Sequence, residues 1–208
     1  MRILLSKEDM KTCDQNTIEG FGVPSCVLME RAALACVDEL YRSGAALDRV
    51  LVICGSGNNG GDGFAIARLL FLDQVPVSIW FVGKEQSCTD QTRHQKEICE
   101  KYGITFCSNP EINEYTVIVD GIFGVGLSRE ITGNYKEIID HMNEAPAYKA
   151  AVDIPSGIHG DTGAVLGTAF EADLTVTFAY KKRGLCLYPG RAYAGRTVVA
   201  DIGIYDRD

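Results

Sequence analysis

The feature that most constrains this chain is an apolar strand that runs through a glycine-rich loop into a helix. Residues 49–54 are apolar and rich in β-branched side chains, which predicts a buried strand, and residues 64–70 place apolar side chains at helical spacing. Between them, residues 55–63 contain five glycines in nine positions. Glycine lets the backbone approach a ligand, and the first N–H groups of a helix attract an anion. We therefore expect a phosphate-bearing ligand at residues 57–63.

The same loop contains a GxGxxG motif at Gly55, Gly57 and Gly60. A dinucleotide fingerprint also requires an acid about 20 residues further on, at the end of the next strand, where it holds a ribose. The strand expected at residues 75–82 is followed by Gly-Lys instead of an acid. No Gly-Lys-Ser/Thr follows the loop, which excludes a nucleotide-hydrolysing P-loop. The alternative interpretation is a tight turn between strand and helix that binds no ligand.

The composition excludes several classes of protein. The 208 residues fit one domain, residues 1–208, and the net charge of -8 argues against nucleic acid or an anionic membrane as a partner. No apolar run approaches transmembrane length, and the first residues contain too short an apolar segment for a signal peptide. The eight cysteines form no CxxC pair and the three histidines show no metal-ligand spacing. We expect buried thiols in a reducing compartment, and hence a cytoplasmic protein.

The rest of the chain alternates between helix and strand. A capping box at Ser6 and Asp9 predicts a first helix that ends near Gly20, and a second helix opens at Pro24 and ends at Gly44. Further helices are expected at 89–102 and 135–142, and further strands at 77–82, 104–107, 116–119, 150–152, 174–179 and 197–200. Because the strands are almost continuously apolar, the predicted fold is α/β, with a mostly parallel central sheet covered by helices on both faces.

Polar residues follow the carboxyl ends of these strands. In a parallel sheet the carboxyl ends lie at one edge, where ligands bind. The glycine loop, Asp120, the loop that leads to Glu130, Asp153 and Ser156 all follow strand ends, so we expect them to meet in one crevice. One such acid could be a helix cap or a turn former. Two acids, each after a buried strand and before a glycine-containing loop, indicate a site.

The residue types in this crevice suggest its chemistry. Asn59, Asp120 and Ser156 offer oxygen ligands of the kind that hard cations take, and one carboxylate with neutral oxygens suits a monovalent ion better than a divalent one. Asp153 follows an apolar strand, and partial burial there suits it to general acid–base catalysis. Asp62 either favours the start of a helix or contacts a ligand hydroxyl. The basic run at residues 181–183 is either a solvated loop or a site that neutralises a phosphate.

Five segments, in this order along the chain, carry a family resemblance: LMERAA at 28–33, GNNGGDG at 57–63, VDGIFGVG at 119–126, VDIPSG at 152–157 and DIG at 201–203. With these segments the chain resembles the NAD(P)H-hydrate epimerases, the YjeF N-terminal domain family, over nearly all of its length. The combination of the second and fourth segments is highly specific.

The resemblance implies a Rossmann-like three-layer sandwich. It also implies an isomerase that interconverts the R and S forms of hydrated NADH and NADPH, in which the nicotinamide ring bears a hydroxyl group. This reaction serves nicotinamide-nucleotide repair, because a partner dehydratase, dependent on ADP or ATP and separate or fused, accepts only the S form. A homodimer that binds one potassium ion per subunit is implied as well.

By position, the resemblance assigns Asp153 as the catalytic residue, and Asn59, Asp120 and Ser156 as potassium ligands. The substrate-binding residues that it implies are Asn58, Asn59, Gly60, Gly61, Asp62, Gly124, Val125, Gly126, Leu127, Ser128, Arg129, Glu130 and Asp153. At the hydrated carbon, loss of the bond to the hydroxyl or to the ring nitrogen, followed by re-addition from the other face, would invert the centre. The sequence leaves both routes open.

Two other functions compete with the epimerase. A non-catalytic nucleotide-binding or scaffold module of the same fold would have no need of Asn59, Asp120 and Asp153 together. An ordinary dehydrogenase is disfavoured because the acid that holds the ribose is missing.

Overall fold

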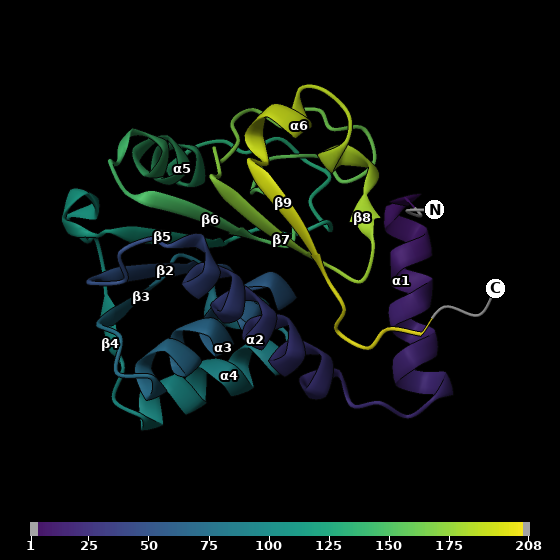
Figure 1. The fold of residues 1–208 in the computed structure, drawn as a ribbon, viewed down its shortest axis with the longest axis horizontal. Helices are drawn as coiled ribbons and strands as arrows, with labels where there is room; N and C mark the ends of the chain where they lie inside the picture. The colour runs from purple at the N-terminus through teal and green to yellow at the C-terminus, as the bar shows by residue number, and fades with distance from the viewer. Residues whose placement is uncertain (1–3, 206–208) are drawn as a thin grey trace.

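A seven-stranded parallel sheet lies between two layers of helices in the computed structural model, which describes residues 4–205 (Figure 1). The order of the strands is β4-β3-β2-β5-β6-β7-β9, so the direction of winding reverses between β2 and β5. The predicted α/β fold is confirmed. The strands are β2 (Val50–Cys54), β3 (Val77–Phe81), β4 (Thr105–Cys107), β5 (Val117–Gly121), β6 (Tyr148–Val152), β7 (Leu174–Phe178) and β9 (Arg196–Ala200).

Helices cover both faces of the sheet, because the buried strands are apolar on both sides. In β2, Val50, Val52 and Cys54 pack into the core beneath α2–α4, whereas Leu51 and Ile53 pack into the core beneath α5. Every helix among residues 4–205 is too short or too polar to cross a bilayer. The helices are α2 (Ser25–Ser43), α3 (Asn58–Leu72) and α4 (Asp90–Lys101) on one face, and α5 (Asn134–Glu144) and the short α6 (Gly190–Tyr193) on the other (Figure 1).

Local signals set the limits of the first two helices as predicted. Ser6 and Asp9 form the expected capping box at the start of α1 (Lys7–Gln15), which continues as a π-helical turn to Gly20. Gly44 ends α2 in the left-handed region, with a φ of 75°.

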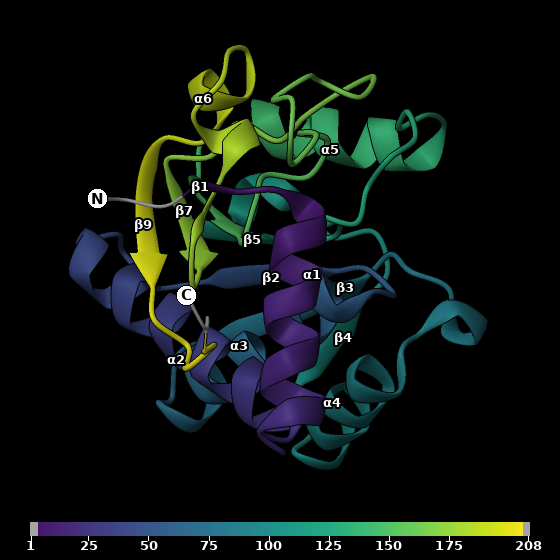
Figure 2. The same cartoon turned by 90° about the vertical axis from the view of Figure 1, so that its right-hand side faces the viewer.

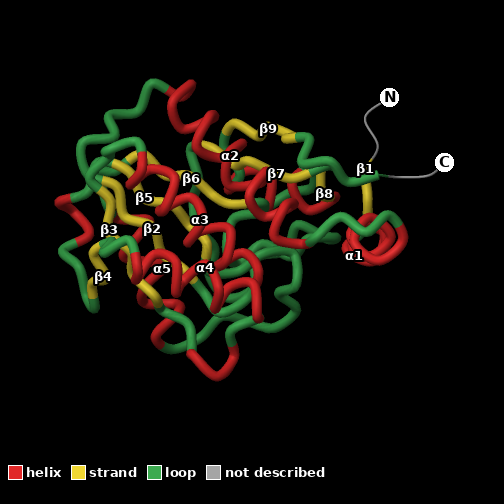
Figure 3. The backbone as a smooth tube through the Cα atoms, turned by 90° about the horizontal axis from the view of Figure 1, so that it is seen from below, coloured by secondary structure: helices red, strands yellow, loops and turns green. Residues whose placement is uncertain are grey.

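The first helix, α1, lies at the carboxyl edge of the sheet, apart from both helical layers (Figures 2 and 3). Before it, β1 (Leu4–Leu5) pairs in parallel with β8 (Lys181–Lys182), and the Lys7 N–H donates to Asp161 Oδ1 at 2.7 Å. At the far end of the helix, the Tyr205 N–H donates to Thr17 Oγ1 at 3.1 Å. The sequence did not predict β1 or β8, because two-residue strands carry no periodic pattern. Through these contacts, α1 spans the edge at which ligands bind in such folds.

Candidate functional site

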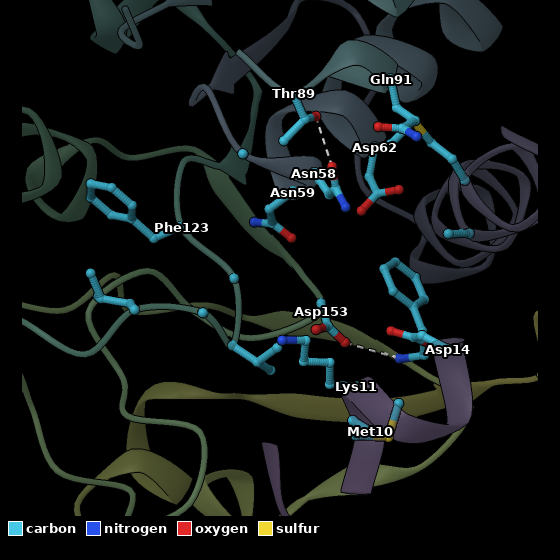
Figure 4. Close-up of a pocket in the computed structure, with 18 of the residues that line it drawn as sticks. Met10, Lys11, Asp14, Asn58, Asn59, Asp62, Thr89, Gln91, Phe123 and Asp153 are labelled. Carbon is cyan, nitrogen blue, oxygen red and sulfur yellow. Dashed lines mark hydrogen bonds between the residues drawn. The ribbon is translucent and has the colours of Figure 1, made fainter. Parts of the chain in front are cut away.

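A cavity of about 1260 Å³ opens between α1 and the carboxyl edge of the sheet. Its walls come from α1, α2, the starts of α3 and α4, the loops that follow β3, β5 and β6, β8, and the segment that follows β9. Figure 4 shows Asn58, Asn59 and Asp62 on one side of it, with Asp153 and Asp14 facing them. Pockets for small molecules measure about 300–1,000 Å³, so this cavity has room for a ligand as large as a dinucleotide.

The glycine loop holds α3 close to the sheet. A Cβ atom on Gly60 would lie 2.0 Å from the Gly55 carbonyl oxygen, and one on Gly61 would lie 2.5 Å from the terminal methyl group of Met29. These two glycines serve packing, and neither lines the cavity. The residues of this loop that do line it are Ser56, Gly57, Asn58, Asn59 and Asp62.

The loop after β5 forms a second wall. Its residues from Gly124 to Arg129 all line the cavity, whereas Glu130 is exposed and lies outside the lining. Beside them, Phe123 packs edge-to-face on Tyr135, with 4.9 Å between the ring centres. This wall offers aromatic and backbone contacts to a planar ligand.

Asp120, which lies near the carboxyl end of β5, and Ser156, which follows β6, form a fully buried cluster. Asp120 Oδ1 accepts a hydrogen bond from Ser156 Oγ at 2.6 Å, and Oδ2 accepts one from the Ser156 N–H at 2.7 Å. The Phe123 N–H donates to Ser156 Oγ at 2.9 Å. Burial raises the pKa of Asp120 to about 6, although these hydrogen bonds oppose the shift. Among the described residues, no cation pairs with this carboxyl group.

Asn59 packs beside this cluster. A Cβ atom on Gly121 would lie 3.1 Å from the Asn59 carbonyl oxygen, and one on Gly124 would lie 3.3 Å from its Oδ1. The Nδ2 atom is buried and has no hydrogen-bond partner in the described part of the chain. Asn59 Oδ1, the buried Asp120 carboxyl group and Ser156 Oγ are oxygen atoms of the kind that a hard monovalent ion takes, and no described cation pairs with that carboxyl group.

Asp153 follows β6 in an uncommon backbone conformation. Its φ is 66°, in the left-handed region, and the Ile154 N–H donates to the Val152 carbonyl in a tight γ-turn. The carboxyl group accepts hydrogen bonds from Thr177 Oγ1 and the Phe178 N–H, both at 3.2 Å. Such strain persists at functional sites because the surrounding structure enforces it, and here it places Asp153 at the cavity.

Lys182, which is only 2% exposed, pairs with Asp153. Its ammonium group donates to Asp153 Oδ1 and to the Phe178 carbonyl, the latter at 2.9 Å. For this lysine the solvated interpretation of the basic run 181–183 is wrong. No local signal distinguishes it from Lys181, because its burial depends on pairing with Leu5 in β1.

Two further carboxyl groups face the cavity. Burial raises the pKa of Asp14 to about 6, with Lys182 opposing the shift and Asp153 adding to it. Burial, and then the charge of Asp153, raise the pKa of Asp62 well above its usual range. Sequence reasoning considered Asp62 but missed Asp14, which lies in a helix far along the chain from the other site residues.

The chain matches the family model described as YjeF-related protein N-terminus over residues 25–184. It is 48% identical over 206 residues to the NAD(P)H-hydrate epimerase of Oenococcus oeni, covering 98% of each chain. It is 45% identical to that of Limosilactobacillus fermentum, covering 97% of this chain and 98% of the relative. The crystal structure of yeast YNL200c superimposes with a TM-score of 0.80 at 21% identity, covering 95% of this chain and 87% of the yeast chain. This likeness shows that the two chains share a fold.

Proposed function

Because the chain belongs to the YjeF N-terminal family and its relatives are named NAD(P)H-hydrate epimerase, we propose that it is an isomerase that interconverts the R and S forms of hydrated NADH and NADPH. One observation in the structure supports this function above all. A cavity with room for a dinucleotide has Asp153 on one wall and the start of α3 on the other. The glycine loop and the loop after β5 would hold the substrate, and Asp153 would act on its hydrated ring.

Asp153 is the catalytic acid–base group of this proposal. Its backbone turn and its hydrogen bonds to Thr177 and Phe178 fix the carboxyl group, and Lys182 compensates its charge. A fixed carboxyl group can give a proton to the atom that leaves the hydrated carbon and take one from the atom that re-adds. Asn58, Asp62 and residues 124–129 would orient the nucleotide. Gly60, Gly61 and Glu130, which lie outside the cavity lining, would act through the shape of the two loops.

We further propose that Asn59, Asp120 and Ser156 hold one potassium ion per subunit. The burial of the Asp120 carboxyl group without a pairing cation, next to the side-chain oxygens of Ser156 and Asn59, supports this assignment. An ion bound there would supply positive charge beside the loops that hold the substrate. These residues join the start of α3 to the loops after β5 and β6, so the occupied site would order both sides of the cavity.

The setting of the reaction is also part of the proposal. The S form would pass to an ADP- or ATP-dependent dehydratase, because epimerisation alone leaves the ring hydrated. The lack of a disulfide among the described cysteines supports a reducing, cytoplasmic location. Each subunit is one domain over residues 1–208 in this proposal. A homodimer is supported by three half-exposed apolar residues spaced by seven along α2, namely Val27, Leu34 and Tyr41. Sedimentation of the wild type and of Leu34→Glu would test the dimer, which should dissociate in the variant.

The decisive experiment follows one purified epimer of hydrated NADH by chromatography. We expect the wild type to speed the approach to the epimer equilibrium, and Asp153→Asn to lose at least about 100-fold in kcat, as loss of general acid–base catalysis does. Substrate binding, measured by calorimetry, should persist in this variant. A rate no greater than the spontaneous one, with or without potassium, would exclude the enzyme and leave the scaffold module as the function. Near-normal turnover by Asp153→Asn would remove Asp153 from the mechanism.

Potassium binding has a separate readout in thermal unfolding. The wild type should melt at a higher temperature in KCl than in choline chloride of equal concentration, because an ion that binds only the folded state stabilises it. Asn59→Ala should abolish this difference, whereas Asn58→Ala, which changes the exposed neighbour, should retain it. Equal melting temperatures of the wild type in the two salts would contradict the potassium site.

A further inference from the structure

Asp14 also lines the cavity, but it belongs to none of the motifs that follow the carboxyl ends of the strands. It lies on α1, its side chain is half-buried, and it faces the same space as Asp62 and Asp153 (Figure 4). No residue that the structure describes forms a hydrogen bond or ion pair with it. The other acids of α1 differ, since Glu8 is exposed and Asp9 belongs to the capping box. Asp14 therefore has no structural partner that explains its position.

The environments of Asp14 and Asp153 are unlike. Lys182 contacts Asp153 and compensates its charge, whereas burial raises the pKa of Asp14 to about 6. The charged groups that face Asp14 are Asp153 after β6, Lys182 in β8 and Asp62 in α3, with Lys11 of its own helix at the cavity. Asp153 is paired with a cation and Asp14 is not, and two carboxyl groups in unlike environments are the usual arrangement of a paired acid and base.

We propose that Asp14 is a second catalytic residue of the epimerisation, which exchanges a proton with the substrate from the α1 wall while Asp153 does so from the sheet edge. This inference rests on the proposed epimerase function. When the hydroxyl group leaves from one face of the ring and water adds to the other, protons move on both faces, and two carboxyl groups on separate walls can serve one face each. A single carboxyl group would have to reach both.

The proton balance is as follows when the hydroxyl group leaves. Protonated Asp14 gives its proton to the hydroxyl oxygen, the C–O bond breaks with its electron pair on oxygen, and water departs. The ring nitrogen supplies its lone pair to the hydrated carbon, and the two atoms form an iminium ion. A solvent water then adds to the opposite face, forms the new C–O bond and gives its extra proton to the Asp153 carboxylate. The protein ends with the same number of protons, and the reverse reaction exchanges the two roles.

The anchoring of α1 supports this role. A catalytic group has to be held in place, and α1 is fixed by β1 before it and by the Tyr205–Thr17 hydrogen bond at its far end. The cavity also suits the passing cation, because Asp14 becomes a carboxylate on the cavity wall once it has given up its proton.

The test compares Asp14→Asn, Asp14→Glu and the control Glu8→Gln, which changes an exposed acid on the same helix. We expect Asp14→Asn to lower kcat at least about 100-fold with KM within about threefold, Asp14→Glu to recover at least about tenfold of that loss, and Glu8→Gln to match the wild type. In the wild type, kcat/KM should fall as the pH rises through about 6, where Asp14 loses its proton, and this fall should be absent from Asp14→Asn.

The possible outcomes separate the proposed function from the role of Asp14. An inactive wild type would refute the proposed function itself. An active wild type with an Asp14→Asn variant within about threefold of its kcat, or with the same pH dependence at a lower rate, would refute the role of Asp14 alone. If the Asn variant does not fold, Asp14→Glu decides: a pH dependence displaced from that of the wild type supports the role, and an unchanged one overturns it.

Discussion

Replacing Lys182 with methionine tests the buried pair on which the geometry of Asp153 depends. Lys182 is 2% exposed and its ammonium group contacts both Asp153 and the Phe178 carbonyl. Methionine fills a similar volume but leaves the Asp153 carboxylate buried without a cation. Removal of one member of a buried ion pair costs about 3–5 kcal/mol, which is a large part of the roughly 5–15 kcal/mol that stabilises a typical domain. We expect Lys182→Met to lose about that amount at pH 7.5.

Urea unfolding followed by circular dichroism measures this loss, with Lys181→Met as the matched control. Lys181 is the partly exposed neighbour in the same short strand, so its replacement should change stability by no more than about 0.5 kcal/mol. In Asp153→Asn/Lys182→Met the remaining group is neutral, so the double variant should be more stable than Lys182→Met by at least about 1.5 kcal/mol.

Two results would refute this reasoning. One is a loss of less than about 1 kcal/mol in Lys182→Met, which would mean that the carboxylate needs no cation. The other is a double variant no more stable than Lys182→Met, which would mean that the two residues are not energetically coupled.

Two other predictions concern packing and protonation. Gly60→Ala should destabilise the fold by about 3 kcal/mol or more, because its Cβ atom would lie 2.0 Å from the Gly55 carbonyl oxygen. The control is Gly57→Ala, whose Cβ atom would have nothing within 4 Å and which should cost less than about 0.5 kcal/mol. Equal urea midpoints for the two variants would contradict this account. Asp14 has a pKa of about 6 in the folded protein against 3.8 for the free side chain. Above about pH 6 its charged form therefore destabilises the folded state, and below about pH 4, where the side chain is neutral in both states, this penalty vanishes. The unfolding free energy of Asp14→Asn minus that of the wild type should therefore grow as the pH rises from about 4 to 7, and a constant difference would refute the desolvation of Asp14.

Most of the fold could be predicted from the sequence because its signals are local. The strand at β2 is recognisable from a continuous apolar run, and the start of α1 from the spacing of Ser6 and Asp9. Parallel strands then bring their carboxyl ends to one edge, which predicts that Asp120 and Ser156 meet although 36 positions separate them. The order and direction of the strands were enough to predict this contact, without any knowledge of side-chain positions.

The parts of the site that could not be predicted depend on segments too short to carry a pattern. Lys182 is buried because a two-residue strand pairs with Leu4 and Leu5, and Lys181 beside it has the same side chain but not the same burial. Asp14 faces the cavity because α1 leaves the helical layers and spans the sheet edge (Figure 2). Nothing in the periodicity of α1 indicates that departure, because an amphipathic helix shows the same pattern whichever surface it covers.

Asp120 and Asp153 show how similar sequence contexts acquire different chemistry. Each follows a buried apolar strand and precedes a glycine-containing loop, so the sequence treats the two acids alike. In the folded chain Asp120 receives neutral donors from Ser156 and Ile122, with no described cation in contact, whereas Asp153 receives the ammonium group of Lys182. A buried carboxylate needs a compensating charge, and the protein itself supplies one only at Asp153. This difference supports the two proposals made above, an external cation at Asp120 and acid–base catalysis by Asp153.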